Sequence, residues 1–281
     1  MKRIASIIFA LTLLMTSVYV SSCKKKKEDA TPKDGLTTES NEAQSQWDDV
    51  LKISEDAMMT NSQSRTEAIN INCATVTAST SSGIFIGQFT IDFGSGTLCS
   101  DGRTRSGQVI VKYTGKYRTA GTIIQSTTNN YFVNGKQIIG CRTVKNTNGT
   151  VLNVIDSALP DSSGYAQIIY PNGGGTTTWK STRIRTWTAG SSTTTLSDDI
   201  YSIAGTASGV SKEGKAYSMN ITNLIVKLEC FLTYYIYMPA GGTIDIITTE
   251  GTRSINYGNG VSCDRNVTFT AIDGKTYELS L

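Results

Sequence analysis

Turn dipeptides punctuate the chain from residue 101 onward, and they limit what it can fold into more than any other feature. They are Asp101-Gly102, Asn134-Gly135, Asn148-Gly149, Asn172-Gly173, Gly241-Gly242, Asn259-Gly260 and Asp273-Gly274. The segments between them show a period of two and are rich in Ile, Val, Thr and Tyr, which suit a half-buried strand. No helical pattern of ten residues recurs between these segments. The pattern therefore argues against parallel α/β folds and the nucleotide sites that they carry.

These signals predict an all-β body, an antiparallel meander of about 14 strands. An open twisted sheet rarely holds so many strands before it curls or splits. We therefore expect a single β-rich domain over residues 63–281, built either as a two-sheet sandwich or as a rolled sheet.

One amphipathic helix is expected ahead of the strands, over residues 39–62. Trp47, Leu51 and Met58 fall on one side of such a helix, and acidic residues occupy other positions. Ser40 is the expected N-cap. The apolar stripe predicts that the helix packs on a sheet face, and a partner-binding helix is the alternative.

The first 22 residues have the pattern of a secretory signal peptide. Lys2 and Arg3 precede an apolar stretch over residues 4–20, which small residues close. The stretch is short of the roughly 20 residues that span a bilayer, so a permanent transmembrane helix is the weaker interpretation. The run Val20-Ser21-Ser22-Cys23 resembles the lipobox of bacterial lipoproteins. That resemblance implies that the Cys23 thiol is acylated and that Cys23 begins the mature chain.

The residues after Cys23 form a charged tether, expected over residues 23–38. Residues 24–29, four lysines followed by Glu and Asp, are similar to the lipoprotein export signal of Bacteroidota. This similarity implies display at the outer face of the outer membrane. The alternative is a solvated linker that carries no export signal. Residues 91–94, 101–107 and 257–264 resemble segments of an uncharacterised, Thr-rich lipoprotein family of Bacteroidota. The resemblance implies anchoring and supplies no site residue.

Composition excludes several classes of function. The 281 residues contain no histidine, which removes Ser-His-Asp and Cys-His nucleophiles and the commonest metal ligand. The net charge of +3 falls to roughly −1 for the body once the signal peptide and the lysine-rich tether are set aside. No CxxC spacing supports a metal site. We expect no cofactor, no metal and no nucleic-acid partner, and we assign no catalytic residue.

Five cysteines follow the lipobox cysteine, and an exported protein is expected to oxidise pairs of them. The odd number leaves one thiol free, and each choice of free thiol allows three connectivities. We favour Cys73–Cys99, which flank the first strand pair, and Cys230–Cys263, which would tie the late strands together. Cys141 then lies in the middle of a strand as a buried free thiol.

Residues 176–188 are the strongest candidate for a ligand site. Strand alternation places Trp179, Arg183, Arg185 and Trp187 on one face. Indole rings beside guanidinium groups can stack on sugar rings, which predicts glycan binding. The alternative is that the indoles pack under the helix or across strands while the arginines make cation–π contacts. A second aromatic segment, residues 231–237, alternates without a polar face and predicts a strand buried on both sides or at a partner interface.

The sequence thus predicts a lipid-anchored outer-membrane protein, exposed at the cell surface, whose body is a non-catalytic binding module. Its expected partners are the membrane, through the anchor, and a glycan, an envelope polymer or an envelope protein. Two other functions stay open. One is a structural or adhesive component of an envelope protein complex, and the other is a hydrolase whose two carboxylates lie about 5 to 10 Å apart in a cleft.

Overall fold

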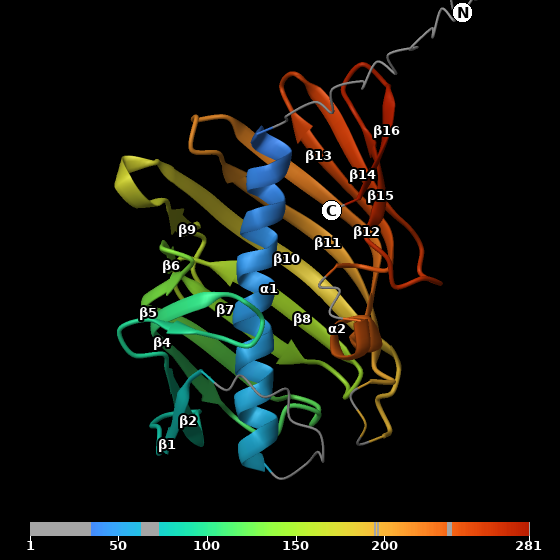
Figure 1. Ribbon diagram of the computed structural model, residues 1–281. Coiled ribbons are helices and arrows are strands. Elements are labelled where there is room, and N and C mark those ends of the chain that lie inside the picture. Colours follow the sequence, from blue (N-terminus) through green and yellow to red (C-terminus); the bar gives the residue numbers. More distant parts are fainter. Residues whose placement is uncertain (1–34, 63–72, 194, 196, 235–237, 281) are drawn as a thin grey trace, which may run out of the picture. The chain divides into compact units, whose positions relative to one another are not determined.

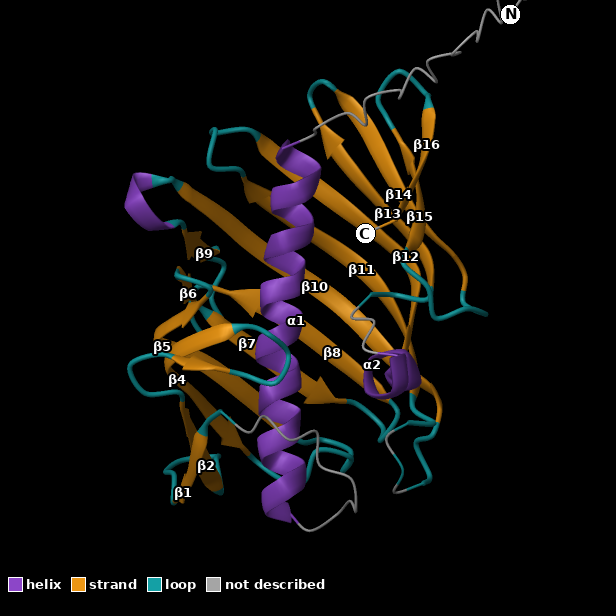
Figure 2. Ribbon diagram, viewed as in Figure 1, coloured by secondary structure: helices purple, strands orange, loops and turns teal. Residues whose placement is uncertain are grey.

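The body of the chain is one antiparallel sheet that curls around a long helix (Figures 1 and 2). The computed structural model describes residues 35–62, 73–193, 195, 197–234 and 238–280. The signal peptide, Cys23 and nearly all of the tether lie outside these residues. The predicted all-β class is confirmed, and of the two expected architectures the rolled sheet is the one found.

Sixteen strands form the sheet, and every pairing is antiparallel. They are β1 Thr75–Ser79, β2 Gly87–Asp92, β3 Thr97–Leu98, β4 Thr104–Tyr113, β5 Ile123–Val133, β6 Lys136–Ile139, β7 Cys141–Asn146, β8 Val151–Ser157, β9 Ala166–Ile169, β10 Thr176–Ala189, β11 Ile200–Val210, β12 Ala216–Lys227, β13 Gly241–Thr248, β14 Gly251–Asn259, β15 Asn266–Thr270 and β16 Thr276–Ser280. A short 3-10 turn, Pro171–Gly173, leads into β10.

The sheet runs from β1 to β16, which lie at the two ends of the pairing path. Between β5 and β10 it follows two routes side by side, one through β6 and β9 and the other through β7 and β8. The two routes pair with different parts of β5 and of β10. The break between β6 and β7 accounts in part for the excess over the 14 strands that the sequence predicts, because a single expected strand spans both.

Gly140 interrupts the pairing between β6 and β7, and a side chain at this position would collide with the sheet and with α1. Its φ is +152°, and a Cβ atom at this position would lie 2.9 Å from the indole of Trp47 and 2.7 Å from the Ser157 carbonyl oxygen. Trp47 is fully buried. A side chain at position 140 would therefore push the helix off the sheet.

Helix α1 spans Gly35–Ser62, so it begins four residues ahead of the predicted start. The predicted cap at Ser40 is wrong, since its hydroxyl donates to the Thr37 carbonyl oxygen at 3.2 Å from within the helix. Of the helix residues whose exposure is described, only Gly35, Thr38 and Ser45 are exposed. A helix enclosed on nearly all sides differs from the expected one with a single buried stripe, and its polar side chains must find partners inside the protein.

The face of the sheet that packs on α1, here called the inner face, holds the apolar core. Ile91, Val111, Met219 and Ile244 are among its buried residues, and each alternates with a polar residue on the opposite, outer face. Burial of each such side chain contributes about 1.5–3 kcal/mol.

Residues 231–234, the start of the segment 231–237 that the sequence predicts as a strand, lie instead in a short helix, α2 (Leu228–Tyr234). Residues 235–237 lie outside the described part of the chain. Phe231 of α2 lies under the Lys52 ammonium, 3.3 Å from the ring centroid, so α2 covers a polar part of α1. Within the described residues, neither helix is long and apolar enough to cross a bilayer.

Both favoured disulfides are present. Cys73–Cys99 joins the residues before β1 to the turn after β3, and Cys230–Cys263 joins α2 to the loop after β14. Cys141 is free and buried, as predicted. The burial of Cys141 raises the pKa of its thiol.

Candidate functional site

Strand β10 brings together the four residues that the sequence singles out, but it turns them toward α1. Trp179, Arg183, Arg185 and Trp187 all lie on the inner face, with exposed fractions of 0%, 2%, 6% and 5%. The shared face is confirmed, and the packing under the helix matches the alternative interpretation. A ligand that bound these side chains would have to replace α1.

Asp156 of β8 is the centre of this buried cluster. Its carboxylate accepts two hydrogen bonds from the Arg142 guanidinium, at 2.5 and 2.9 Å, and one from the Trp179 indole at 2.9 Å. The Ser181 hydroxyl donates to it at 2.6 Å. Burial alone would raise the pKa of Asp156, but Arg142 and then Arg183 lower it to about 2. The Asp156 carboxylate therefore stays ionised, and hydrogen bonds hold it in position on the inner face of the sheet.

Asp48 of α1 completes this cluster from the helix side. It lies 3.1 Å from Arg142 and 2.9 Å from Arg183, so the two arginines bridge the helix and the sheet. Both guanidinium groups are almost fully buried. Buried charges of this kind are tolerated only when they are paired, and the pairing fixes the position of α1 along β7 and β10.

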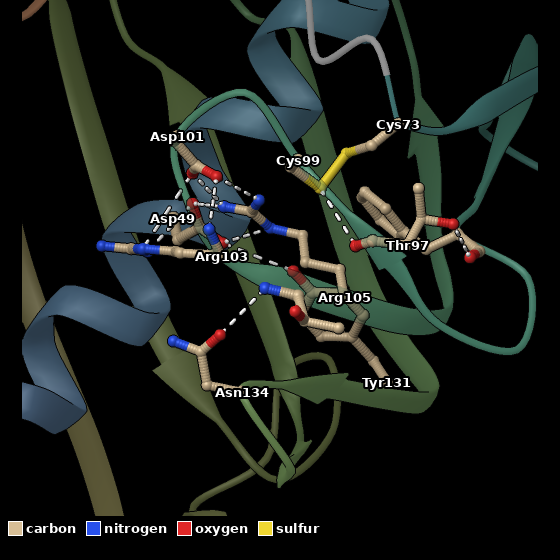
Figure 3. Close-up of a disulfide and its surroundings, with 11 residues drawn as sticks. Asp49, Cys73, Thr97, Cys99, Asp101, Arg103, Arg105, Tyr131 and Asn134 are labelled. Atoms are coloured by element: carbon tan, nitrogen blue, oxygen red, sulfur yellow. Dashed lines mark hydrogen bonds and ion pairs between the residues drawn. A yellow bond between two sulfur atoms is a disulfide. The ribbon is translucent and has the colours of Figure 1, made fainter.

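A second cluster lies beside the first disulfide (Figure 3). The Arg105 guanidinium makes hydrogen bonds of 2.7 Å to Asp49 of α1 and of 2.6 Å to Asp101 in the turn after β3. Arg103 also contacts Asp49, at 3.1 Å. Cys99 precedes Asp101 by two residues. The Cys73–Cys99 disulfide therefore restrains the turn whose Asp101 is joined through Arg105 to Asp49 in the middle of α1.

Two further carboxylates of α1, Glu55 and Glu39, also accept hydrogen bonds from the sheet side. Glu55 accepts hydrogen bonds from Arg185, at 2.5 Å, and from the Tyr117 hydroxyl. Glu39, near the other end, accepts from the Thr177 hydroxyl at 3.0 Å and from the Lys212 backbone amide at 2.9 Å. The helix is therefore bound by charge along most of its length.

Trp187 packs against an aromatic ring and a guanidinium group on the inner face. Its ring stacks on Tyr201 at 5.1 Å, and the Arg118 guanidinium lies 4.0 Å from its ring centroid. Arg185 lies 3.6 Å from the Tyr201 ring centroid. These are the cation–π contacts of the alternative interpretation.

Two pairs of carboxylates at the interface between α1 and the sheet side each share one arginine. Asp48 and Asp156 share Arg142, and Asp49 and Asp101 share Arg105. A glycoside hydrolase needs its two carboxyl groups at the sugar, one of them able to give up a proton. Asp156 is held ionised and has no exposed surface, which does not fit that role. No group of three or more acids and cysteines suited to a metal ion occurs within the described part of the chain.

The outer face has a hollow of about 600 Å³ at the β1 end of the sheet, here called the outer groove. Its lining is Thr75, Thr77 and Ser79 of β1, Thr90 and Asp92 of β2, Gly94, and Gln108 of β4. The groove forms because the alternate residues of three neighbouring strands point to the same side, with Thr75 opposite Asp92 and Asp92 opposite Gln108.

The polar groups of the groove are held in place by one another. Asp92 accepts hydrogen bonds of 2.8 Å from the Gln108 side-chain amide and from the Gly94 backbone amide. Gln108 in turn accepts one of 3.0 Å from Asn129. The bond from Gln108, followed by the bond from Gly94, lowers the pKa of Asp92. The groove therefore offers an ionised acceptor and several hydroxyl groups, which can each donate and accept.

A longer feature of the outer face, here called the polar row, crosses the sheet from the groove to β16. It is a continuous series of directly paired residues, none of them buried. The row consists of Ser79, Gln88, Lys112, Gln125, Thr143, Ile155, Thr182, Thr206, Asn220, Asp245, Ser254, Thr270 and Thr276.

The groove and the row are the residues that sequence reasoning misses. Asp92 enters that reasoning only within the segment 91–94, and threonine enters it only as a strand-forming residue type. Alternation marks the two faces of each strand, but it does not tell which strands are neighbours or in what register. The polar row is defined by which residues of neighbouring strands are paired, and no local sequence pattern specifies that pairing.

Comparison of the chain with protein-family models, with curated proteins and with solved structures gives no match.

Proposed function

We propose that this protein is a lipid-anchored lipoprotein of the outer membrane, exposed at the cell surface, whose β body is a non-catalytic module that binds a neutral glycan or envelope polymer. The outer groove is the observation that carries the binding part of the proposal. It is an open hollow in which every lining residue except Gly94 carries a hydroxyl, amide or carboxylate group, and the methyl groups of its threonines and other side-chain carbons add apolar surface between them. Polyhydroxylated ligands are recognised by such groups when they are held in position.

The anchor rests on the lipobox at Cys23 and on the oxidised cysteines of the body. Two disulfides are typical of a compartment outside the cytoplasm. The part of the expected tether that precedes α1, residues 23–34, has few apolar residues. It would let the body stand away from the membrane surface.

The binding proposal is tested with the full chain, purified in detergent, on immobilised neutral polysaccharides (mannan, laminarin, dextran and xylan) and on polygalacturonate as an anionic probe. We expect retention on at least one neutral polymer and none on polygalacturonate. Asp92→Ala should reduce retention by about tenfold, because it removes the oriented acceptor and frees Gln108.

Asp273→Ala is the matched control, since Asp273 is also exposed and also accepts a backbone hydrogen bond two residues on, from Lys275 at 3.1 Å. It should leave retention unchanged. Equal loss in both variants, or no retention of the parent protein on any neutral polymer, would refute glycan binding in the groove.

The anchor is tested by labelling cells with a palmitate analogue. The label should appear on the parent chain and be absent from Cys23→Ala, and protease added to intact cells should remove the body of the parent protein. A labelled Cys23→Ala variant would show that the acyl chain is elsewhere, and a body that resists external protease would contradict surface display.

A structural role in an envelope complex is the second candidate, and the edge strand β1 favours it. All five residues of β1 are exposed, and β1 is the end of the pairing path. An exposed edge can accept a strand from another chain. In this case, envelope proteins should co-purify with Asp92→Ala as well as they do with the parent protein.

A further inference from the structure

The polar row differs from an ordinary solvated sheet face in the kind of polar group that it presents. Ten of its thirteen side chains are Ser, Thr, Asn or Gln, and only Lys112 and Asp245 carry charge. A surface shaped for solubility alone would be expected to hold about 25–35% Lys, Arg, Glu and Asp. The row has one charge of each sign and is therefore close to neutral along its whole length.

The row is also long and regular. Neighbouring strands lie about 4.8 Å apart, so thirteen strands carry hydrogen-bonding groups over about 55–60 Å of curved surface. Each position is directly opposite the next, because the row lies clear of the register shifts that occur elsewhere in five of these strand pairs. The row also begins in the outer groove, where Ser79 belongs to both.

We infer that the polar row is a track along which an extended neutral polysaccharide lies, with the outer groove as its first contact. This inference rests on the proposed function and specifies the ligand as a polymer that crosses the strands. A nearly neutral row fits a neutral chain, since only Lys112 and Asp245 bring charge to the contact. Hydroxyl groups on both sides can exchange donor and acceptor roles, which makes the contact repeatable along the polymer.

Each contact on the track is weak, so affinity must come from the number of contacts. The row has no exposed aromatic ring, and hydrogen bonds exposed to water give little net stabilisation each, about 0.5–1.5 kcal/mol. A polymer that occupies many positions gains through effective concentration. Affinity should therefore rise steeply with chain length, whereas a short oligosaccharide should bind only in the groove.

Thr182 and Thr206 are the positions at which to break the track. They lie opposite each other near its middle, are both exposed, and are remote from the groove along the row. Valine keeps the shape and the β-branch of threonine and removes only the hydroxyl group. Thr252→Val is the matched control, because Thr252 is exposed on β14, two residues from the row member Ser254.

The test measures binding of the full chain to a neutral polysaccharide that retains it, and to a hexasaccharide of the same sugar. The polymer should bind at least about tenfold more tightly per chain. The double variant Thr182→Val/Thr206→Val should weaken polymer binding by about fivefold or more and leave hexasaccharide binding unchanged. Thr252→Val should change neither, and circular dichroism should show that all variants keep the parent fold.

The outcomes separate the two proposals. If the parent protein binds no neutral polymer, glycan binding and the track both fail. If it binds one, loses that binding in Asp92→Ala, but is indifferent to polymer length and to the double variant, the groove stands and the track is overturned. Weakening by Thr252→Val as large as by the double variant would also overturn the track.

Discussion

The two faces of the sheet are built from the same strands, but they differ in burial and in charge. On β10 the inner face presents Trp179, Arg183 and Arg185, which are buried and paired with acids of α1. The outer face of the same strand presents Thr182, Ile184 and Thr186, which are open to solvent or partly so. The inner face is strongly charged and closed, whereas the outer face is nearly neutral and open.

This difference indicates that the charged residues of the inner face serve mainly to position α1 on the sheet. Every arginine of the helix clusters has an acid on the helix or on a neighbouring strand, so these residues select one position of α1. The outer face has few such constraints, since most of its polar groups face water. We therefore expect substitutions on the inner face to change stability and substitutions on the outer face to change contacts.

The largest effect is expected for Asp156→Asn. The substitution removes the buried one of the two anions that Arg142 and Arg183 share and leaves them only Asp48, which costs about 3–5 kcal/mol in the free energy of unfolding. Urea denaturation at pH 7 measures it. Asp245→Asn, in the polar row, is the control and should cost less than about 1 kcal/mol.

The pH dependence of the parent protein follows from the same carboxylate. Its folded pKa, about 2, lies below the value of an unfolded aspartate, so its contribution is present above pH 4 and is lost as the pH falls toward 2. Asp156→Asn should remove that part of the acid sensitivity. Similar losses from Asp156→Asn and Asp245→Asn would contradict the division between the faces.

The next largest effect is expected when the first disulfide is removed. The Cys73→Ser/Cys99→Ser variant should lose about 3 kcal/mol, because a link across 26 residues no longer restricts the unfolded chain. It should also speed hydrogen exchange around Asp49, since the turn that holds this residue is released. Cys141→Ser is the control, and unchanged exchange at Asp49 would show that the bridge does not support the grip on α1.

A smaller effect is expected at Asp56, which lies on α1 but lacks an arginine. Neither of its carboxylate oxygens has a hydrogen-bond partner among the described residues, and burial raises its pKa well above the ordinary value despite the opposing influence of Lys52. A raised folded pKa gives stability that is present below pH 4 and is lost as the pH rises through the folded value.

Asp56→Asn should therefore gain stability relative to the parent protein as the pH rises from 4 to 8. Urea midpoints at pH 4, 6 and 8 measure the gain, which should be smaller than the disulfide effect. A constant difference between variant and parent at the three pH values would mean that Asp56 titrates as an ordinary aspartate.

The smallest effect is expected for Thr206→Val on the outer face. The exposed hydroxyl is replaced by a methyl group of the same shape, so the free energy of unfolding should change by less than about 0.5 kcal/mol. A thermal melt measures it. A loss near that of Asp156→Asn would mean that the outer row is itself part of what stabilises the fold.

The fold was largely predictable because its signals are local. Strand alternation, turn dipeptides and the spacing of Trp47 and Leu51 gave the class, the helix and the rolled sheet as one of two architectures. The segment from residue 231 to 234 was predicted wrongly because a short apolar run has no reliable period. The disulfide of α2 to Cys263 and the contact of α2 with Lys52 are tertiary.

The site was less predictable because it depends on which elements meet. The tryptophans and arginines of β10 have the same spacing whether they bind sugar or a helix. One signal favoured the helix: α1 has six acids and one lysine among its 28 residues, an excess that needs cations if the helix is enclosed. The outer groove had no comparable signal, since its parts lie on three strands whose order and register must be known.

The pairing of α1 with distant strands also decides when the protein can finish folding. Asp49 and Arg105 are 56 residues apart, Glu55 and Arg185 are 130 apart, and Glu39 and Lys212 are 173 apart. The helix precedes all of these partners in the chain, so its contacts are complete only after β10 and the turn between β11 and β12 have been added. Contacts over such long sequence separations are typical of slow folding.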